Sequence, residues 1–116
     1  MSDPVKVFET QEVVMASGQK LSTTFTIPSW AFFCGILTPQ ITDGDITLQI
    51  STDGTNFFPV LDDNDGAAFI VAASGADPGW TDVSDRIRFV TPVMKLRLVS
   101  SVNAGEEETF TIQLTG

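Results

Sequence analysis

The apolar and polar residues of this chain alternate with a period of two along much of its length. Such alternation is typical of β-strands, in which successive side chains point to opposite faces. It is clearest in residues 21–27, 46–51, 94–98 and 110–114. Shorter apolar runs that predict further strands are residues 12–15, 33–37, 57–61, 68–72 and 87–90. No segment carries the i, i+3, i+4 spacing of an amphipathic helix over three turns, so the pattern predicts an all-β chain of about eight strands.

Turn residues separate these runs at regular intervals. Asp-Gly or Ser-Gly steps occur within residues 16–19, 42–45, 52–56 and 63–66. We expect Asp53 and Gly54 to close a tight hairpin, because both residue types favour the backbone conformations of tight turns. Residues 73–82 form the longest stretch without alternation, which predicts a surface loop anchored by Trp80. This spacing of strands and turns is typical of an antiparallel β-sandwich of the jelly-roll kind.

The length of 116 residues is typical of one domain. We expect a flexible arm over residues 1–10 and a single β-sandwich domain over residues 11–116. Cys34 is the only cysteine, so no disulfide can form within the chain, and its apolar neighbours predict a buried thiol. The sequence has no basic leader and no apolar run near the roughly 20 residues of a membrane span, so we expect neither export nor a membrane partner.

Charge and hydropathy narrow the class of partner. The formal net charge is −9 at pH 7 and the sequence pI is about 4.1, so the field of the protein repels phosphate backbones. Nucleic acid is therefore not an expected partner. The mean hydropathy of +0.16 is high for a small acidic domain, which favours the placement of some apolar side chains in interfaces with other proteins.

The residue types that most catalytic sites need are missing from the sequence. It has no histidine and no tyrosine, which excludes Ser-His-Asp and Cys-His arrangements and imidazole metal sites. Two carboxylates could still act on a glycosidic bond, but the Asp and Glu residues lie almost entirely in turns, where Asp forms local hydrogen bonds. We therefore expect no enzyme, no catalytic residue and no cofactor.

The Asp-Asp-Asn-Asp-Gly sequence at residues 62–66 offers clustered oxygen atoms of the kind that calcium prefers. It does not match an EF-hand, because the first ligand position falls on Leu61. A calcium site of another kind and an acidic hairpin loop without a metal are both left open, with the loop as our expectation. The same alternatives apply to Asp43 and Asp45.

Four of the six basic residues fall in two alternating segments. They are Arg86, Arg88, Lys95 and Arg97. If the two segments are neighbouring antiparallel strands, these side chains share one outward face and form a docking surface for an acidic partner. The alternative is a solvated face that pairs in part with the acidic loops. The three glutamates at residues 106–108 predict a solvated hairpin tip before the last strand.

Trp30 and Trp80 are candidates for stacking on sugars, because a flat indole ring offers a large face at little entropic cost. Trp30 follows Pro28 at the end of a predicted strand, where packing at a corner of the domain is the commoner role. A tryptophan in a small β domain is also more often a core anchor. Glycan binding and core packing are both left open at these two positions.

The order of several segments between Thr24 and Leu114 carries a resemblance to a known family. These segments are residues 25–30, residues 46–60 with their Ser-Thr-Asp-Gly-Thr-Asn-Phe sequence, residues 62–66 and residues 95–100. In them the chain resembles small β-sandwich proteins encoded among the virion structural genes of tailed bacteriophages. The apolar residues around Cys34 and the run from Arg86 to Arg88 depart from that pattern, which leaves the docking surface open.

The resemblance implies a structural role without catalysis. Similar proteins serve as capsid decoration (cement) proteins or as head, neck and fibre components. We expect a decoration protein that is made in the host cytoplasm, lies on the capsid surface of the virion and bridges copies of the major capsid protein. Its N-terminal arm and an exposed sheet edge would pair with capsid strands, and it could also form a homo-oligomer. The alternatives are a glycan-binding module of a fibre, with Trp30 and Trp80 as its site, and a neck or tail component.

Overall fold

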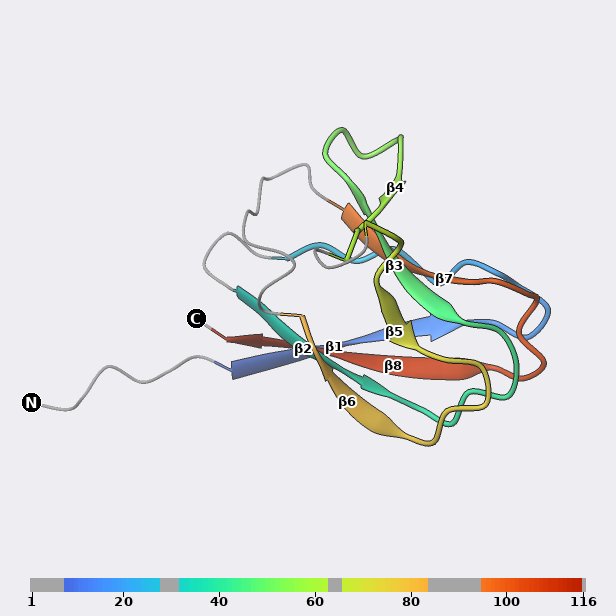
Figure 1. The fold of residues 1–116 in the computed structure, drawn as a ribbon. Coiled ribbons are helices and arrows are strands. Elements are labelled where there is room, and N and C mark those ends of the chain that lie inside the picture. The colour runs from blue at the N-terminus through green and yellow to red at the C-terminus, as the bar shows by residue number, and fades with distance from the viewer. Residues whose placement is uncertain (1–7, 28–31, 63–65, 84–94, 116) are drawn as a thin grey trace, which may run out of the picture.

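The computed structural model describes residues 8–27, 32–62, 66–83 and 95–115. These residues form eight strands in two antiparallel sheets, and Figure 1 shows the sheets as the two layers of a β-sandwich. The predicted fold class is thereby confirmed. The strands are β1 (Phe8–Met15), β2 (Phe32–Thr38), β3 (Ile46–Ser51), β4 (Phe58–Pro59), β5 (Ile70–Ala72), β6 (Gly79–Asp82), β7 (Lys95–Ser100) and β8 (Glu108–Thr115). No helix capable of spanning a membrane occurs in the described part of the chain.

The first sheet, sheet A, has the strand order β1-β8-β2-β6. In β8 the buried side chains of Phe110, Ile112 and Leu114 alternate with polar residues, which places one row in the core and the other on the outer face. The outer edge of β1 is covered by the segment that follows it, because the Thr23 backbone N–H donates to the Val14 carbonyl at 3.0 Å. Among the described residues, β6 has a partner strand on one side only.

A β-bulge in β2 changes which of its residues face the core. The pairing of β2 with β8 shifts between Phe33 and Gly35. Phe33 and Ile36 therefore both point inward and are almost fully buried, whereas Gly35 lies on the outer face opposite Gln113. The Cys34 thiol beside the bulge donates to the Gln113 carbonyl at 3.1 Å and is intermediate in burial, whereas the sequence predicted a buried thiol.

The second sheet, sheet B, is built around β3. β7 pairs along the whole of β3 on one side, and β4 and β5 share the other side. Residues 21–27 run along the free edge of β7, where Phe25 and Leu96 exchange backbone hydrogen bonds of 2.9 and 2.8 Å. The sequence predicted a regular strand there, but only isolated bridges form, because the segment divides its hydrogen bonds between β7 and β1. With this segment in the place of a second strand, the strand order is that of a jelly roll.

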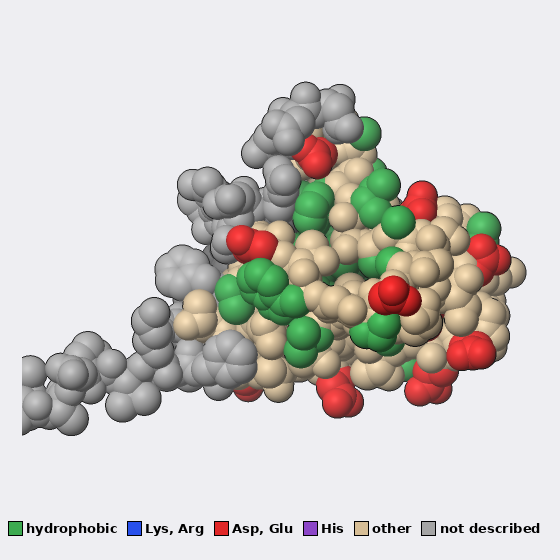
Figure 2. Space-filling model, turned by 60° about the horizontal axis from the view of Figure 1, so that its bottom comes forward, with side chains coloured by type: hydrophobic (Ala, Val, Ile, Leu, Met, Phe, Trp, Pro, Cys, Tyr) green, Lys and Arg blue, Asp and Glu red, His purple; other side chains and the backbone are tan. Residues whose placement is uncertain are grey.

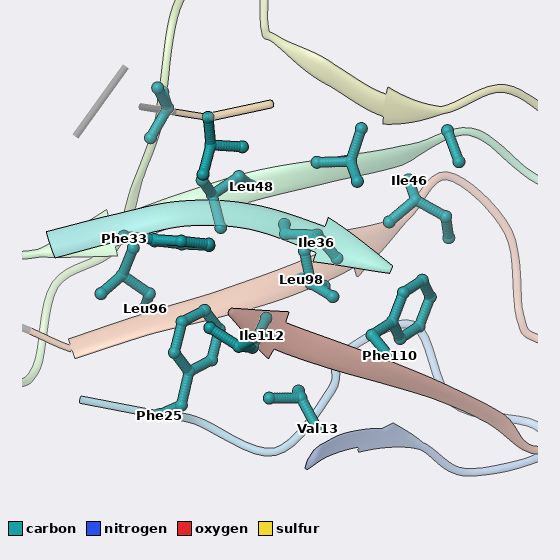
Figure 3. Packing of buried hydrophobic residues seen from close by; sticks show 14 of the residues in the cluster. Val13, Phe25, Phe33, Ile36, Ile46, Leu48, Leu96, Leu98, Phe110 and Ile112 are labelled. Atoms are coloured by element: carbon teal, nitrogen blue, oxygen red, sulfur yellow. The ribbon is translucent and has the colours of Figure 1, made fainter. Parts of the chain in front are cut away.

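The core lies between the two sheets, and each sheet supplies large apolar side chains to it. Figure 3 shows Ile36 of sheet A and Leu98 of sheet B among the side chains that fill the space between the sheets, and the Phe25 and Phe33 rings lie close to each other. The centres of these two rings are 5.7 Å apart and their planes meet at 80°, an edge-to-face arrangement. Burial of each such side chain contributes roughly 1.5–3 kcal/mol, so a core of this kind can form without a disulfide.

The structure corrects two predictions about loops. Residues 73–82 were expected to form one loop anchored by Trp80, but β6 occupies its last four positions and the Trp80 side chain is half exposed. The tight hairpin expected at Asp53 is a longer connection, because the pairing of β3 with β4 ends at Ile50 and Phe58. Both differences arise where turn residues flank strands that are only a few residues long.

The remaining strand predictions agree with the structure in type and differ in their ends. β3 coincides with the predicted residues 46–51, and β1, β2, β4, β5, β7 and β8 overlap their predicted ranges, whereas β6 lies in the predicted loop. β1 begins at Phe8, inside the range 1–10 that the sequence suggests as an arm. Residues 1–7 and the predicted strand at residues 87–90 lie outside the described residues.

Candidate functional site

Two of the four basic residues suggested for docking lie on the outer face of sheet B. Lys95 and Arg97 alternate along β7 with buried leucines, so their side chains point away from the core. Arg86 and Arg88 lie outside the described residues. One edge of β7 pairs with β3, and the other edge forms backbone hydrogen bonds with residues 21–25. The suggestion that the segment of Arg86 and Arg88 is a strand beside that of Lys95 and Arg97 falls outside the described residues and stays a hypothesis.

Arg97 is held in place on sheet B by two contacts. Its Nε donates to Oε1 of Gln49 on β3 at 2.9 Å. Its guanidinium carbon also lies 4.0 Å from the centre of the Phe57 ring. Stacking of a cation on an aromatic face contributes about 0.5–1 kcal/mol at exposed sites. The arrangement fixes a positive charge at a defined point on this face of an acidic protein.

Exposed apolar side chains lie on the same outer face. Pro59, Leu61 and Ile70 alternate with the buried Val60 and Phe69, so they point outward from the β4 and β5 segments. The Phe69 backbone N–H donates to the Val60 carbonyl at 2.7 Å, which brings the two segments side by side. We call Pro59, Leu61 and Ile70 the sheet B patch. Gathered apolar side chains on a soluble domain are typical of a surface that binds another protein.

Trp80 lies on the outer face of sheet A, against β2. A Cβ atom at Gly35 would overlap the indole atoms Nε1, Cε2 and Cζ2, so the ring rests directly on the Gly35 backbone. The indole Nε1 donates to Oε1 of Gln113 on β8 at 2.6 Å. Leu37, which is opposite Trp80 in the register, is also exposed. We call Trp80, Gly35, Leu37 and Gln113 the Trp80 platform; Trp30, the other suggested stacking residue, lies outside the described residues.

The surroundings of the Trp80 platform are polar. In the strand register, Leu37 lies in line with Thr111 of β8 and Glu12 of β1, and Gly35 lies in line with Gln113 and Thr10. Figure 2 views the molecule from the side of sheet A and shows hydrophobic side chains with acidic ones around them. No Lys or Arg side chain of a described residue is visible in that view.

Asp53 organises the loop between β3 and β4. Its carboxylate accepts hydrogen bonds of 2.8 Å from the Asn56 and Thr55 backbone N–H groups, of 2.8 Å from the Asn56 side chain and of 2.9 Å from the Ser51 hydroxyl. These donors, the Asn56 backbone first, hold the pKa of Asp53 well below its usual range. Gly54 supplies the positive φ of 83° that the turn requires. The carboxylate is therefore a structural cap of its own loop.

The other described acidic loops do not form a metal site. The Asp45 carboxylate accepts the Ser74 backbone N–H at 2.9 Å and so ties two loops together at one end of the sandwich. Among the described residues, no group of three or more His, Cys, Asp or Glu side chains is arranged to hold a metal ion. Asp63, Asn64 and Asp65 of the suggested calcium loop lie outside those residues, so calcium binding there stays a hypothesis.

Glu108 is a buried carboxylate at the start of β8. It was predicted to lie in a solvated hairpin tip, but only 3% of its surface is exposed, and that prediction was wrong. Neither carboxylate oxygen has a hydrogen-bond partner among the described residues. Burial is the main cause that raises the pKa of Glu108. The backbone of Thr42 lowers this pKa in part, although it does not form a hydrogen bond of good geometry, and the negative charge of Glu106 raises it further. Its position could have been found from the sequence, because Glu108 shares the period-two row of Phe110.

The described residues thus offer two surfaces with different chemistry. One is the sheet B patch together with Arg97 and Lys95, and the other is the Trp80 platform on sheet A. The sequence named the residues Lys95, Arg97 and Trp80 but not their neighbours, because those neighbours come from strands distant in the chain. No family model, curated protein or solved structure matches this chain.

Proposed function

We propose that this protein is a virion structural protein without catalytic activity, and specifically a capsid decoration protein that binds the major capsid protein. The observation that carries the proposal is the outer face of sheet B, where the sheet B patch lies on the same face as the Arg97–Phe57 stack. The resemblance of residues 24–114 to β-sandwich virion proteins of tailed bacteriophages gives the proposal its biological setting. Decoration requires only a binding surface on a stable domain.

The sheet B face has the composition of a protein-binding surface. Leu61 and Ile70 are each about half exposed, and their burial against a partner would release apolar surface from water. Arginine and aromatic residues are enriched at the centres of protein interfaces, and here the Arg97 guanidinium is already stacked on Phe57. The side chain therefore loses little conformational freedom on binding.

Charge gives the interface an orientation. The chain carries a net charge of −9, whereas Lys95 and Arg97 place two positive charges on the outer face of sheet B. An acidic patch on the partner would therefore attract this face and repel the rest of the molecule. On a capsid, the same contact repeats at every equivalent position of the shell, so a modest affinity per copy is sufficient for bridging neighbouring subunits.

Sedimentation tests the proposal directly. The purified chain is mixed with undecorated capsids of the phage that encodes it, and the copies bound per shell are counted after centrifugation. Saturable binding at hundreds of copies, about the number of capsid subunits or of their symmetry positions, is the expected result. Empty shells should also resist heat better with the protein bound, because ligands that bind only the intact state stabilise it.

Two outcomes would overturn the proposal. Absence of binding to the shell would remove the capsid as the partner. Saturation at about a dozen copies or fewer would assign the protein to the neck, tail or fibre, where the number of positions is small. A double variant, Leu61→Ser with Ile70→Thr, tests whether the sheet B patch is the surface that binds the shell. It removes apolar area from the patch, and both substitutes remain compatible with the outward face of a strand.

A further inference from the structure

The Trp80 indole is fixed in position before any ligand arrives. The bulge in β2 brings Gly35 to the outer face, and its missing side chain leaves the space in which the ring lies. The hydrogen bond of 2.6 Å from Nε1 to Gln113 stops rotation of the ring about its own axis. A ring held in this way loses little entropy on binding, which is the advantage of a preorganised site.

One face of the ring stays open to solvent. Trp80 is 52% exposed, while the opposite face rests on the Gly35 backbone. Because Gln113 already accepts the indole N–H, the ring offers a ligand only its π face. That face carries the negative end of the ring quadrupole, so it attracts groups with partial positive hydrogens or a full positive charge. The C–H groups on one face of a pyranose ring have this character.

The surroundings favour a neutral polyhydroxylated ligand. The positions in line with the platform are Thr111, Glu12 and Thr10, whose side chains can donate or accept hydrogen bonds. An anionic ligand would be repelled by the net charge of −9. A protein partner would need a wider apolar centre, since specific protein interfaces bury about 800 Å² on each side.

We propose that the Trp80 platform is a carbohydrate-binding subsite that stacks one pyranose ring of a neutral oligosaccharide on the exposed indole face. The hydroxyl groups of that sugar and of its neighbour lie along β8 and β1, over Gln113, Thr111 and Thr10. The site is on sheet A and is independent of the proposed capsid contact on sheet B. The protein would then hold a surface glycan while it is attached to its shell.

Nuclear magnetic resonance titration of the folded chain tests this proposal. The Trp30→Phe variant is used as the background, so that Trp80 gives the only indole N–H signal. The probes are neutral tetrasaccharides of glucose, of galactose, of mannose and of N-acetylglucosamine, each added separately. At least one should shift the Trp80 indole signal and the Gly35 and Gln113 amide signals in a saturable way, with a dissociation constant of about 1 mM or below.

Two variants and one control assign the site. Trp80→Ala removes the ring, and Gly35→Ala keeps the ring but fills the space beneath it, so each should weaken binding by about tenfold or more. Because a Cβ at Gly35 points to the outer face and not to the core, the backbone spectrum away from the platform should be unchanged. Phe58→Ala is the matched control: Phe58 is an aromatic residue with 64% exposure outside the platform, and its loss should leave binding unchanged.

Three results would overturn the assignment. The first is the absence of any saturable shift with all four saccharides. The second is equal binding by Trp80→Ala or Gly35→Ala and the parent chain. The third is a shift of the Trp80 signal by a lysine- and arginine-rich peptide or by a sulfated saccharide with none from the neutral saccharides, because the platform would then recognise charge. Loss of sugar binding leaves capsid sedimentation unaffected, so failure of this proposal and of the proposed function are distinguishable.

Discussion

The outer faces of the two sheets are built by the same alternation but differ in what they present. Sheet B exposes Leu61 and Ile70 and places the cation of Arg97 over Phe57. Sheet A exposes one flat indole, that of Trp80, among threonine, glutamine and acidic positions. The inner faces of both sheets are mainly apolar, with Ser100 of β7 and Glu108 of β8 as buried polar exceptions. The alternation of apolar and polar residues therefore specifies the sandwich. The outward-facing residues determine what each sheet can bind.

The difference also shows how the two faces could act at the same time. They lie on opposite sides of one core, so a partner bound to sheet B leaves sheet A open to solvent. An apolar face with a fixed cation suits a large protein surface, whereas an isolated aromatic ring with polar neighbours suits a small ligand. Substitutions on one face should therefore have no effect on the other.

The largest expected effect follows from removal of the sheet B patch. The double variant Leu61→Ser with Ile70→Thr should weaken capsid binding by roughly 100-fold, because truncation of each central interface residue should cost about 1.4 kcal/mol, a factor of ten. Its melting temperature should stay near that of the parent, since both side chains are already half exposed. Leu37→Ser on sheet A is the matched control, and equal losses from both variants would remove the distinction between the faces.

Replacement of Arg97 by alanine should affect both stability and binding. The variant loses the stack on Phe57 and the hydrogen bond to Gln49, so we expect about 1–2 kcal/mol less free energy of unfolding and a clear loss of capsid affinity. Urea unfolding at neutral pH measures the first quantity. Lys95→Ala, which removes a fully outward cation on the same strand, should leave stability nearly unchanged. Equal destabilisation by both variants would show that charge alone, and not the stack, is responsible.

Glu108 offers a test of the sandwich that carries both faces. Its pKa is raised in the folded state, so the native protein binds more protons than the unfolded chain between the ordinary pKa of 4.5 and the raised value. The free energy of unfolding should therefore fall as pH rises through this window. Glu108→Gln removes that slope and should gain about 1 kcal/mol at pH 7, because an unpartnered buried charge is replaced by a neutral amide.

Thermal unfolding from pH 4 to pH 8 measures this effect. Glu107→Gln is the matched control, because it removes the same charge from an exposed neighbour and should retain the slope of the parent. A parallel pH profile for the parent and for Glu108→Gln would contradict the assignment. Binding to either face should be unchanged by the substitution, since Glu108 points into the end of the sandwich.

The smallest expected effect concerns the Asp53 loop. The pKa of Asp53 is lowered in the folded state, so its contribution is present above its ordinary value of 3.8 and is lost as pH falls through the lowered value. Asp53→Ala should speed hydrogen exchange at the Thr55 and Asn56 amides without altering that of β3. Asp77→Ala, in another exposed loop, is the control. Unchanged exchange at the two amides would show that the carboxylate is not their cap.

The alternation of apolar and polar residues was sufficient to predict the long strands, but it did not predict the features that distinguish the outer faces of the two sheets. β3, β7 and β8 have enough alternating residues for their faces to be read directly. β6 is four residues long, follows Pro78 and begins with Gly79, so the sequence resembles a loop there. The position of Trp80 depends on a bulge in β2, and a bulge shifts the register without a signal that alternation could reveal.

Glu108 illustrates the opposite case. Three consecutive glutamates predicted a solvated tip, and this composition outweighed the period-two row that Glu108 shares with Phe110 and Ile112. In the structure the Glu108 side chain points inward like those of Phe110 and Ile112, because β8 already begins at Glu108 and alternate residues of a strand share one face. The basic residues were read correctly as outward on β7, but their neighbours across the sheet depend on strand order, which a single sequence does not specify.

An electron cryomicroscopy reconstruction of shells saturated with the protein would show directly whether sheet B faces the capsid, as we propose. We expect density on the outer surface of the shell in which Leu61, Ile70 and Arg97 contact the major capsid protein and Trp80 faces solvent. Density in which the outer face of sheet A contacts the shell, or density confined to a single vertex, would contradict it.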